Sequence, residues 1–259
     1  MKNPKSILVT GASSGLGAEL ARNYAAAGIT LFLCGRNETR LDEVAEDCRS
    51  CGATVHADLI DVSDEKAMAD WITECDGMSA LDLVVANAGI GIGFTTEMDL
   101  GNHVRQIYDI NVGGVFNTVH PAIRLMQPRG RGQIAIISSL AGYHGLPGSP
   151  AYSTSKACVK AYGEALRGLY ARHGIEINVV CPGYVKSPMT AGNNFPMPFL
   201  MESDKAIRAL RRGLERNQAR ITFPWQLSLI YGAMVRFLPE WLFDRLFRLM
   251  PAKNQTTKN

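Results

Sequence analysis

The sequence predicts an α/β fold built on a doubly wound parallel sheet of about seven strands, with helices on both faces and a helical C-terminal extension. Short apolar segments rich in Val and Ile alternate with longer amphipathic segments through most of the 259 residues. The short segments are apolar on both faces, as expected for parallel strands that helices cover on either side. Because parallel neighbours need right-handed crossovers, this alternation predicts a doubly wound sheet.

The individual elements follow this alternation. Six buried strands are expected at Ser6–Thr10, Thr30–Cys34, Ala53–Asp58, Leu81–Ala86, Gly132–Ser138 and Ile175–Cys181. The helices between them are expected at about residues 15–27, 38–50, 64–76, 97–127 and 151–172. No linker rich in Pro, Gly or Ser divides the chain, so residues 1–259 are expected to form one domain with its core at about residues 5–190.

The alternation weakens after about Ser187, and residues 187–250 are expected to supply a substrate lid and C-terminal helices. Residues Thr190–Phe199 combine Gly, Asn and Pro with Phe and Met, which is typical of a mobile lid over an apolar ligand. A basic helix at 204–220 precedes a last strand, Ile221–Pro224. Two helices are then expected at Leu227–Leu238 and Trp241–Met250, and the tail 251–259 is expected to be disordered.

The C-terminal helices leave two interpretations open. A transmembrane span needs about 20 apolar residues, and Arg236 and Pro239 interrupt this region. The favoured interpretation is that these helices pack on the domain or on a second subunit of a homodimer or homotetramer. The alternative is peripheral contact, with a helix lying on a membrane surface.

Composition narrows the class of protein. The chain is 46% hydrophobic and 20% charged, as in a soluble globular protein. A formal charge of +3 is too small to indicate nucleic-acid binding. No secretory signal is found at the N-terminus, so the six cysteines are interpreted as reduced thiols of a cytoplasmic protein. Cys48 and Cys51 form a C-x-x-C without a second ligand pair, and no metal site is expected.

A glycine-rich turn joins the first strand to the first helix in the sequence Thr10-Gly11-Ala12-Ser13-Ser14-Gly15-Leu16-Gly17. Glycines at such a turn let the backbone approach a pyrophosphate, which the exposed N–H groups and the positive helix end then hold. A tight turn can also need glycine for steric reasons alone. The position of this turn after the first strand favours dinucleotide binding.

The spacing T-G-x-x-x-G-x-G differs from the G-x-G-x-x-G of ordinary Rossmann dehydrogenases and resembles the fingerprint of the short-chain dehydrogenase/reductase family. Six further motifs of that family occur in its order and spacing over about residues 6–190. They are Asp61-Val62, Asn87-Ala88-Gly89, Asn111, Ser139, Tyr152-Ser153-Thr154-Ser155-Lys156 and Pro182-Gly183. The resemblance implies a Rossmann-type fold and a nicotinamide-dependent oxidoreductase.

In this family the end of the second strand distinguishes NAD(H) from NADP(H). An acidic residue there would accept hydrogen bonds from the adenosine ribose and repel a 2′-phosphate. This sequence has Cys34-Gly35-Arg36-Asn37 instead, and the planar guanidinium of Arg36 suits bidentate phosphate contacts. The alternative is that Arg36 is a solvated residue opening the next helix. NADP(H) is therefore favoured over NAD(H).

The resemblance implies the other cofactor contacts as well. Asp61 and Val62 would lie near the adenine, Asn87 under the adenosine, and residues 182–187 beside the nicotinamide. The expected cofactor-binding residues are Gly11, Ser13, Ser14, Gly15, Leu16, Gly17, Arg36, Asp61, Val62, Asn87, Ala88, Gly89, Tyr152, Lys156, Pro182, Gly183, Val185 and Ser187.

Tyr152 and Lys156 are four residues apart in a predicted helix, so both project from one face. Hydride transfer between a nicotinamide and a carbonyl carbon generates or consumes an alkoxide, so a proton must move at the oxygen. A tyrosine with an ordinary pKa of about 10 is a poor base at neutral pH. We expect the Lys156 ammonium to lower the pKa of Tyr152 by up to about three units. Tyr152 is the expected general acid/base.

Two further residues complete the expected catalytic group. Ser139 would hydrogen-bond the substrate oxygen, although a serine at a strand end can also simply cap a turn. Asn111 lies within a predicted helix, where asparagine is unfavourable, and Gly113 and Gly114 suit a local interruption. In the family this asparagine breaks the helix and anchors a water in a proton relay to the lysine.

The resemblance places two segments beside the substrate. One carries Tyr143, His144 and Leu146, and the other carries Tyr184 and Met189. The sequence therefore predicts an NADP(H)-dependent enzyme that interconverts a carbonyl compound and an alcohol, with an apolar or lipid-like small-molecule substrate. Two alternatives are an epimerase or dehydratase of the extended branch, whose loop and larger C-terminal domain are absent, and a non-catalytic NADP(H)-binding regulator or membrane-associated scaffold.

Overall fold

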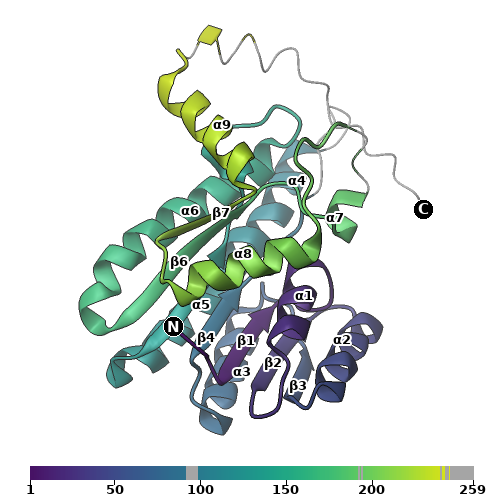
Figure 1. The fold of residues 1–259 in the computed structure, drawn as a ribbon, viewed down its shortest axis with the longest axis vertical. Helices are drawn as coiled ribbons and strands as arrows, with labels where there is room; N and C mark the ends of the chain where they lie inside the picture. The colour runs from purple at the N-terminus through teal and green to yellow at the C-terminus, as the bar shows by residue number, and fades with distance from the viewer. Residues whose placement is uncertain (92–98, 192, 194, 240, 243–244, 246–259) are drawn as a thin grey trace.

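A computed structural model describes residues 1–91, 99–191, 193, 195–239, 241–242 and 245. It confirms the α/β class: seven parallel strands form one sheet in the order β3-β2-β1-β4-β5-β6-β7 (Figure 1). The strands are β1 (Ser6–Thr10), β2 (Thr30–Gly35), β3 (Thr54–Leu59), β4 (Leu83–Ala86), β5 (Gly132–Ile137), β6 (Ile175–Pro182) and β7 (Arg220–Phe223). The order reverses between β1 and β4, as in a doubly wound sheet.

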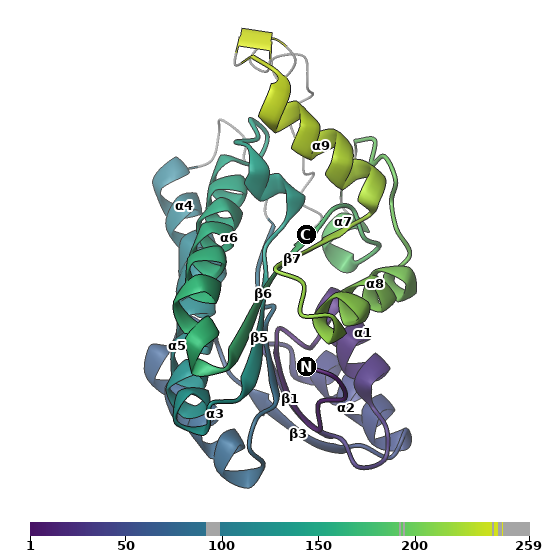
Figure 2. The ribbon, with the colours of Figure 1, turned by 60° about the vertical axis from the view of Figure 1, so that its left-hand side comes forward.

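Helices cover both faces of the sheet (Figure 2). One layer contains α1 (Gly15–Tyr24), α2 (Glu38–Ser50) and α8 (Ser203–Glu215). The other contains α3 (Glu65–Met78), α5 (Gly114–Met126) and α6 (Pro150–Tyr170), with α4 (Leu100–Tyr108) preceding α5. Two further helices, the short α7 (Pro188–Ala191) and α9 (Trp225–Phe237), lie toward one end of the molecule, and α9 projects from that end.

The alternation of side chains along each strand explains the two layers. In β1, Ile7 and Val9 join the apolar core beneath α1, α2 and α8, whereas Leu8 joins the core beneath α3, α5 and α6. All three side chains are fully buried. Because successive residues of a strand point to opposite faces, a strand buried on both faces must be apolar throughout.

The largest difference from the predicted elements concerns residues 97–127. Instead of one helix, α4 ends at Tyr108, a π-helical turn occupies Asp109–Gly113, and α5 begins at Gly114. A π-turn inserts an extra residue and interrupts the regular i to i+4 hydrogen bonding. The interruption expected around Asn111 is thus present, because this turn contains that residue.

Smaller differences have local causes. Helix α1 ends at Tyr24, three residues early, because Ala25 is already extended. Helix α8 ends at Glu215 rather than at 220, since Asn217 adopts a left-handed conformation with φ of 47°. Strand β4 begins at Leu83, because the N–H of Leu81 donates to the carboxylate of Asp76 in the last turn of α3.

Helix α9 starts two residues before the predicted 227–238 helix. Most of the predicted 241–250 helix and the whole 251–259 tail lie outside the described residues. Among the helices that the structure describes, none has the length and apolar character needed to cross a bilayer.

Candidate active site

A cavity of about 1090 Å³ lies at the carboxyl ends of the central strands, where α/β sheets of this topology bind ligands. Its walls contain most of the residues expected from the sequence. They are Gly11, Ser13, Ser14, Gly15, Leu16, Arg36, Asp61, Val62, Asn87, Ala88, Gly89, Ser139, Tyr152, Lys156, Pro182, Gly183, Val185 and Ser187. Gly17 and Asn111 are not among the lining residues that the structure describes.

The glycine-rich turn is held against the end of β4. The Thr10 hydroxyl accepts hydrogen bonds from the N–H groups of Asn87 and Ala88, both at 3.1 Å. The Asn87 amide donates to the carbonyl of Thr10 at 2.9 Å. Gly11 has a φ of 66°, and a Cβ there would lie 2.7 Å from the Ala88 Cα. The bare backbone therefore forms the cavity wall at this turn.

The same turn fits a pyrophosphate. Helix α1 begins at Gly15, and the side chain of its N-cap residue, Ser14, makes no capping hydrogen bond. Ser14, Gly15 and Leu16 line the cavity, so the start of a ten-residue helix meets it. A helix N-terminus with backbone N–H groups facing a cavity is suited to an anionic ligand.

Gly17 allows close packing of the backbone and is not among the described residues that line the cavity. A Cβ at Gly17 would lie 2.5 Å from the Asn87 amide nitrogen and 2.6 Å from the Gly11 carbonyl oxygen. We expect Gly17→Ala to reduce the free energy of unfolding by about 1–3 kcal/mol, because overpacking forces the backbone to move. Urea unfolding measures this effect.

The matched control is Gly77→Ala in α3, where a Cβ would meet nothing within 4 Å. Alanine is favoured over glycine inside a helix, so this control should be neutral or more stable by up to about 1 kcal/mol. Equal effects of the two substitutions would contradict the packing role of Gly17.

Two arginines lie beside the turn at the end of β2. The Arg36 guanidinium is 58% exposed and lies 3.6 Å from the Asp61 carboxylate. Burial alone would raise the pKa of Asp61, but hydrogen bonds from Ser63 and the Arg36 guanidinium bring that pKa below its ordinary value. Arg40, which the sequence analysis did not single out, also lines the cavity. Its position in the first turn of α2, directly after the end of β2, was the available signal.

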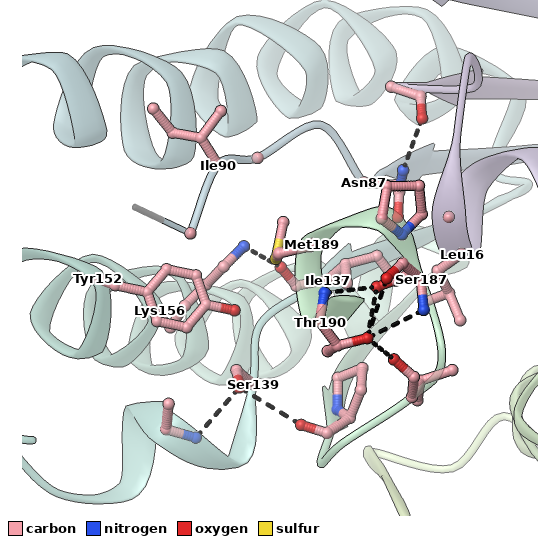
Figure 3. A pocket seen from close by; sticks show the side chains of 18 of the residues that line it. Leu16, Asn87, Ile90, Ile137, Ser139, Tyr152, Lys156, Ser187, Met189 and Thr190 are labelled. Carbon is pink, nitrogen blue, oxygen red and sulfur yellow. Dashed lines mark hydrogen bonds between the residues drawn. The ribbon is translucent and has the colours of Figure 1, made fainter. Parts of the chain in front are cut away.

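Ser139, Tyr152 and Lys156 meet in the cavity (Figure 3). The Ser139 side chain lies close enough to the Tyr152 hydroxyl to lower its pKa. The Ser139 hydroxyl also accepts from the N–H of Ala141 at 3.1 Å and donates to the Pro182 carbonyl at 3.3 Å. The neighbouring Ser138 hydroxyl donates instead to the Lys156 carbonyl at 2.7 Å. The serine at 139 is therefore the one that the structure pairs with Tyr152.

The acid–base properties differ from the sequence-based expectation. Burial raises the pKa of Tyr152, and the neighbouring Ser139, which lowers it, only partly offsets that rise. Burial lowers the pKa of Lys156 to about 8. The Lys156 Nζ lies 5.9 Å from the centre of the Tyr152 ring and donates to the Ile137 carbonyl at 3.0 Å. The expected lowering of the Tyr152 pKa by Lys156 is thus not seen, because desolvation is the larger influence and the group that lowers this pKa is Ser139.

Asn111 lies behind the cavity wall. Its side chain is fully buried, accepts from the N–H of Ile90 at 2.8 Å and donates to the Ile90 carbonyl at 3.0 Å. The Asn111 amide nitrogen also donates a hydrogen bond to the Ser155 hydroxyl at 3.1 Å. A Cβ on Gly89 would approach the Asn111 Oδ1 and the Lys156 Nζ at 3.1 and 3.2 Å. Asn111 therefore holds the 89–90 backbone that separates it from the cavity.

The remaining wall is largely apolar. Leu146, Tyr184 and Met189 line it, together with Leu227 and Tyr231 of α9, which the sequence analysis missed. The last two are four apart on an apolar helix, which was the available signal.

Tyr143 and His144 are not among the described lining residues. The Tyr143 ring packs between Lys160 and Arg220, each cation 5.5 Å from its centre. That pairing directs Tyr143 elsewhere, so its expected place beside the substrate was wrong.

In the described part of the chain, no three or more His, Cys, Asp or Glu side chains are arranged to hold a metal ion. The described titratable side chains that line the cavity are Tyr152, Lys156, Tyr184, Tyr231, the two arginines and the Asp61 carboxylate near Arg36. This composition suits proton transfer at an oxygen beside a bound anionic cofactor.

Comparisons with known proteins agree with this geometry. Residues 5–196 match the model of the short chain dehydrogenase family. The chain is 42% identical to an uncharacterized oxidoreductase of Myxococcus xanthus over 94% of its own length and 96% of the relative's. It is 30% identical to an Arabidopsis thaliana protein named 11-beta-hydroxysteroid dehydrogenase 1A, over 92% of this chain and 74% of that one.

Among solved structures, a short-chain dehydrogenase from Sphingobium yanoikuyae in complex with NADPH superimposes with a TM-score of 0.79 at 22% identity, over 97% of this chain and 98% of that one. This likeness confirms the Rossmann-type fold. Together with the family match and the identity to the Myxococcus protein, it shows that the chain belongs to the short-chain dehydrogenase/reductase family of nicotinamide-dependent oxidoreductases.

Proposed function

We propose that the protein is an NADP(H)-dependent oxidoreductase that interconverts an apolar ketone or aldehyde and its alcohol, with Tyr152 as the general acid/base. The observation that carries the proposal is the Ser139–Tyr152–Lys156 group in the same cavity as the glycine-rich turn and Arg36. A bound nicotinamide would supply or accept the hydride. The protein's own residues must then orient the substrate oxygen and move one proton.

Ser139 and Tyr152 converge on one point from two different elements. Ser139 follows β5 and Tyr152 lies in the first turn of α6, so the two hydroxyls approach the cavity from separate supports. A carbonyl oxygen seated between them would accept a hydrogen bond from each. Ser139 polarises the carbonyl, and the Tyr152 hydroxyl gives its proton as the oxygen gains negative charge.

The raised pKa of Tyr152 supports reduction as the direction of the reaction at neutral pH. A phenol with a raised pKa stays protonated, which is the form that donates to an alkoxide. Lys156 is charged below its pKa of about 8 and lies on the other side of the ring, where it stabilises the phenolate left after donation. The reductive rate should therefore fall as the pH rises above about 8.

The apolar wall supports an apolar substrate. Leu146, Met189, Leu227 and Tyr231 face the cavity beyond the catalytic group. A relative that is named a hydroxysteroid dehydrogenase is consistent with this choice. The direct test is NADPH oxidation with a panel of ketones and aldehydes of increasing apolar size. Turnover of none of them by a protein that binds NADPH would favour the non-catalytic regulator.

Cofactor preference is proposed to depend on Arg36, with Arg40 beside it. A charge-assisted hydrogen bond contributes about 1.5–3 kcal/mol, so Arg36→Ala should weaken NADPH binding by about 10–100-fold and NADH binding far less. Fluorescence titration of both coenzymes measures the difference. Arg49→Ala is the control, because its guanidinium bonds the Val55 carbonyl and does not line this cavity. Equal losses for the two coenzymes would contradict a 2′-phosphate contact.

A further inference from the structure

Helix α9 carries an exposed apolar surface. Of the thirteen large apolar side chains that are exposed in the described part of the chain, six lie on α9 or just beyond it. They are Trp225, Leu229, Ile230, Val235, Phe237 and Trp241, here called the α9 patch. Trp225 is 69% and Phe237 79% exposed. Exposed apolar side chains on a soluble protein are usually isolated from one another, whereas these six lie on one helix or just beyond it. The helix projects from the end of the molecule (Figures 1 and 2).

The same helix also reaches the cavity. Leu227 and Tyr231 line the cavity from α9, and Met189 lines it from α7. Met189 is itself 44% exposed, and Phe199 and Leu200 follow shortly after it with exposed side chains. The patch and the cavity thus share helix α9, so a ligand leaving an apolar surface at α9 would meet the cavity directly.

The charges around the patch are positive. From Arg216 to Trp241 the sequence contains three arginines and one acidic residue, Glu240, so the net charge is positive. Arg236 lies within the patch and is exposed, and Arg220 precedes α9 by five residues, paired with Glu164. Residues Trp225–Val235 carry no charge at all. An apolar strip with a cationic end is complementary to an apolar surface that bears anionic groups.

We propose that the α9 patch binds the surface of a lipid bilayer that contains anionic headgroups, and that the cavity takes its apolar substrate from that bilayer. A helix of 13 residues is about 20 Å long, which is too short to cross a hydrocarbon core of about 30 Å. It therefore lies in the interface. Trp225 and Trp241 bracket it, and indoles favour the headgroup level, where the ring is apolar and the N–H is hydrated.

A second copy of the chain fits the patch less well. In a two-fold interface the patch of one copy packs against the same patch of the other copy. The charges and apolar groups of the patch must therefore be complementary to one another. The exposed Arg236 would then face a surface whose sequence, from Arg216 to Trp241, holds three arginines and one acidic residue, Glu240. Like charges brought together in this way are unfavourable, whereas anionic lipid neutralises each of them.

The test is flotation of the full-length protein with vesicles of phosphatidylcholine alone or mixed with phosphatidylglycerol. The wild-type protein should float with the mixed vesicles, and Trp225→Ser/Leu229→Ser/Phe237→Ser should reduce the bound fraction at least about tenfold. Met78→Ser/Leu169→Ser, which removes exposed apolar side chains from α3 and α6, should float like the wild type. Arg236→Glu should lose binding to mixed vesicles in particular. Equal unfolding midpoints show that each variant is folded.

Tryptophan emission gives a second readout. Of the three tryptophans, Trp71 is buried and donates to Asp58 at 2.8 Å, whereas Trp225 and Trp241 belong to the patch. A blue shift on adding mixed vesicles therefore reports burial of the patch. Absence of flotation and of a blue shift in the wild type would overturn the proposal. So would a dimer that the triple substitution converts to a monomer while neither protein binds vesicles.

Membrane binding stands independently of the chemistry, but delivery of the substrate rests on the proposed function. Vesicle binding is measured without coenzyme or substrate, and turnover of a water-soluble ketone is measured without vesicles. Failure of the first with success of the second removes only the membrane surface. The triple variant should reduce a soluble ketone like the wild type, because none of its three positions lines the cavity.

Discussion

Replacing Tyr152 with Phe is expected to lower kcat by about 10²–10⁴-fold while NADPH binding changes little. The substitution removes one hydroxyl, which lies beside Ser139 and is the proposed proton donor. The ring remains, so the wall of the cavity keeps its shape. Steady-state kinetics with the best ketone of the panel, and NADPH fluorescence titration, measure the two effects separately.

Tyr162→Phe is the matched control on the same helix. The Tyr162 hydroxyl lies 2.6 Å from the His120 Nε2 and is not among the described residues that line the cavity. Burial raises the pKa of Tyr162 as it raises that of Tyr152, so a raised pKa alone does not distinguish the two. Undiminished turnover in Tyr152→Phe, or an equal loss in both variants, would eliminate Tyr152 as the proton donor.

Replacing Lys156 with Met should lower kcat by about 10²–10³-fold, the loss typical of one preorganised charged donor, and yet make the folded protein more stable. Burial depresses the pKa of Lys156 from 10.5 to about 8. At pH 7 the folded state therefore holds an ammonium that it disfavours by on the order of 3 kcal/mol. Methionine removes that cost but leaves the Ile137 carbonyl without its partner, which costs about 1–3 kcal/mol. A net gain on the order of 1 kcal/mol is expected.

The depressed pKa of Lys156 also predicts how the stability of the folded protein changes with pH. Between pH 8 and pH 10.5 the unfolded chain holds more protons at this lysine than the folded chain does, so stability rises with pH across that window. The advantage of the Met variant over the wild type should therefore shrink from pH 7 to pH 10. Urea midpoints at several pH values measure it. A difference that stays constant with pH would mean that Lys156 has an ordinary pKa.

Much of the fold could be predicted from local patterns. Strands β1, β2, β5 and β6 match their predicted ranges within a residue, because strands buried on both faces are apolar throughout and end at polar or glycine-rich turns. The register of the motifs likewise predicted which backbone segments meet in the cavity. Parallel strands deliver their carboxyl ends to one edge, so residues after β1, β4, β5 and β6 had to converge there.

The directions in which side chains point could not be predicted from such local patterns. Tyr143 was expected in the cavity, but Arg220, 77 positions away in the sequence, attracts its ring elsewhere. Asn111 was expected in the site and lies one layer behind it, since its amide satisfies the backbone of Ile90. The pKa of Tyr152 depends on how much water burial excludes, which spacing along a helix does not report.

The strand order also divides the residues that line the cavity into two groups along the sequence. The turn after β1 and the two arginines after β2 all come from the first 40 residues, whereas Ser139, Tyr152, Met189, Leu227 and Tyr231 come from residue 139 onward. Both groups line one cavity. A chimera joined between β4 and β5 would therefore exchange the substrate wall, together with residues 182–187, for those of a relative while retaining the glycine-rich turn and the two arginines. The proposed choice between NADP(H) and NAD(H) and the substrate range can thus be inherited independently.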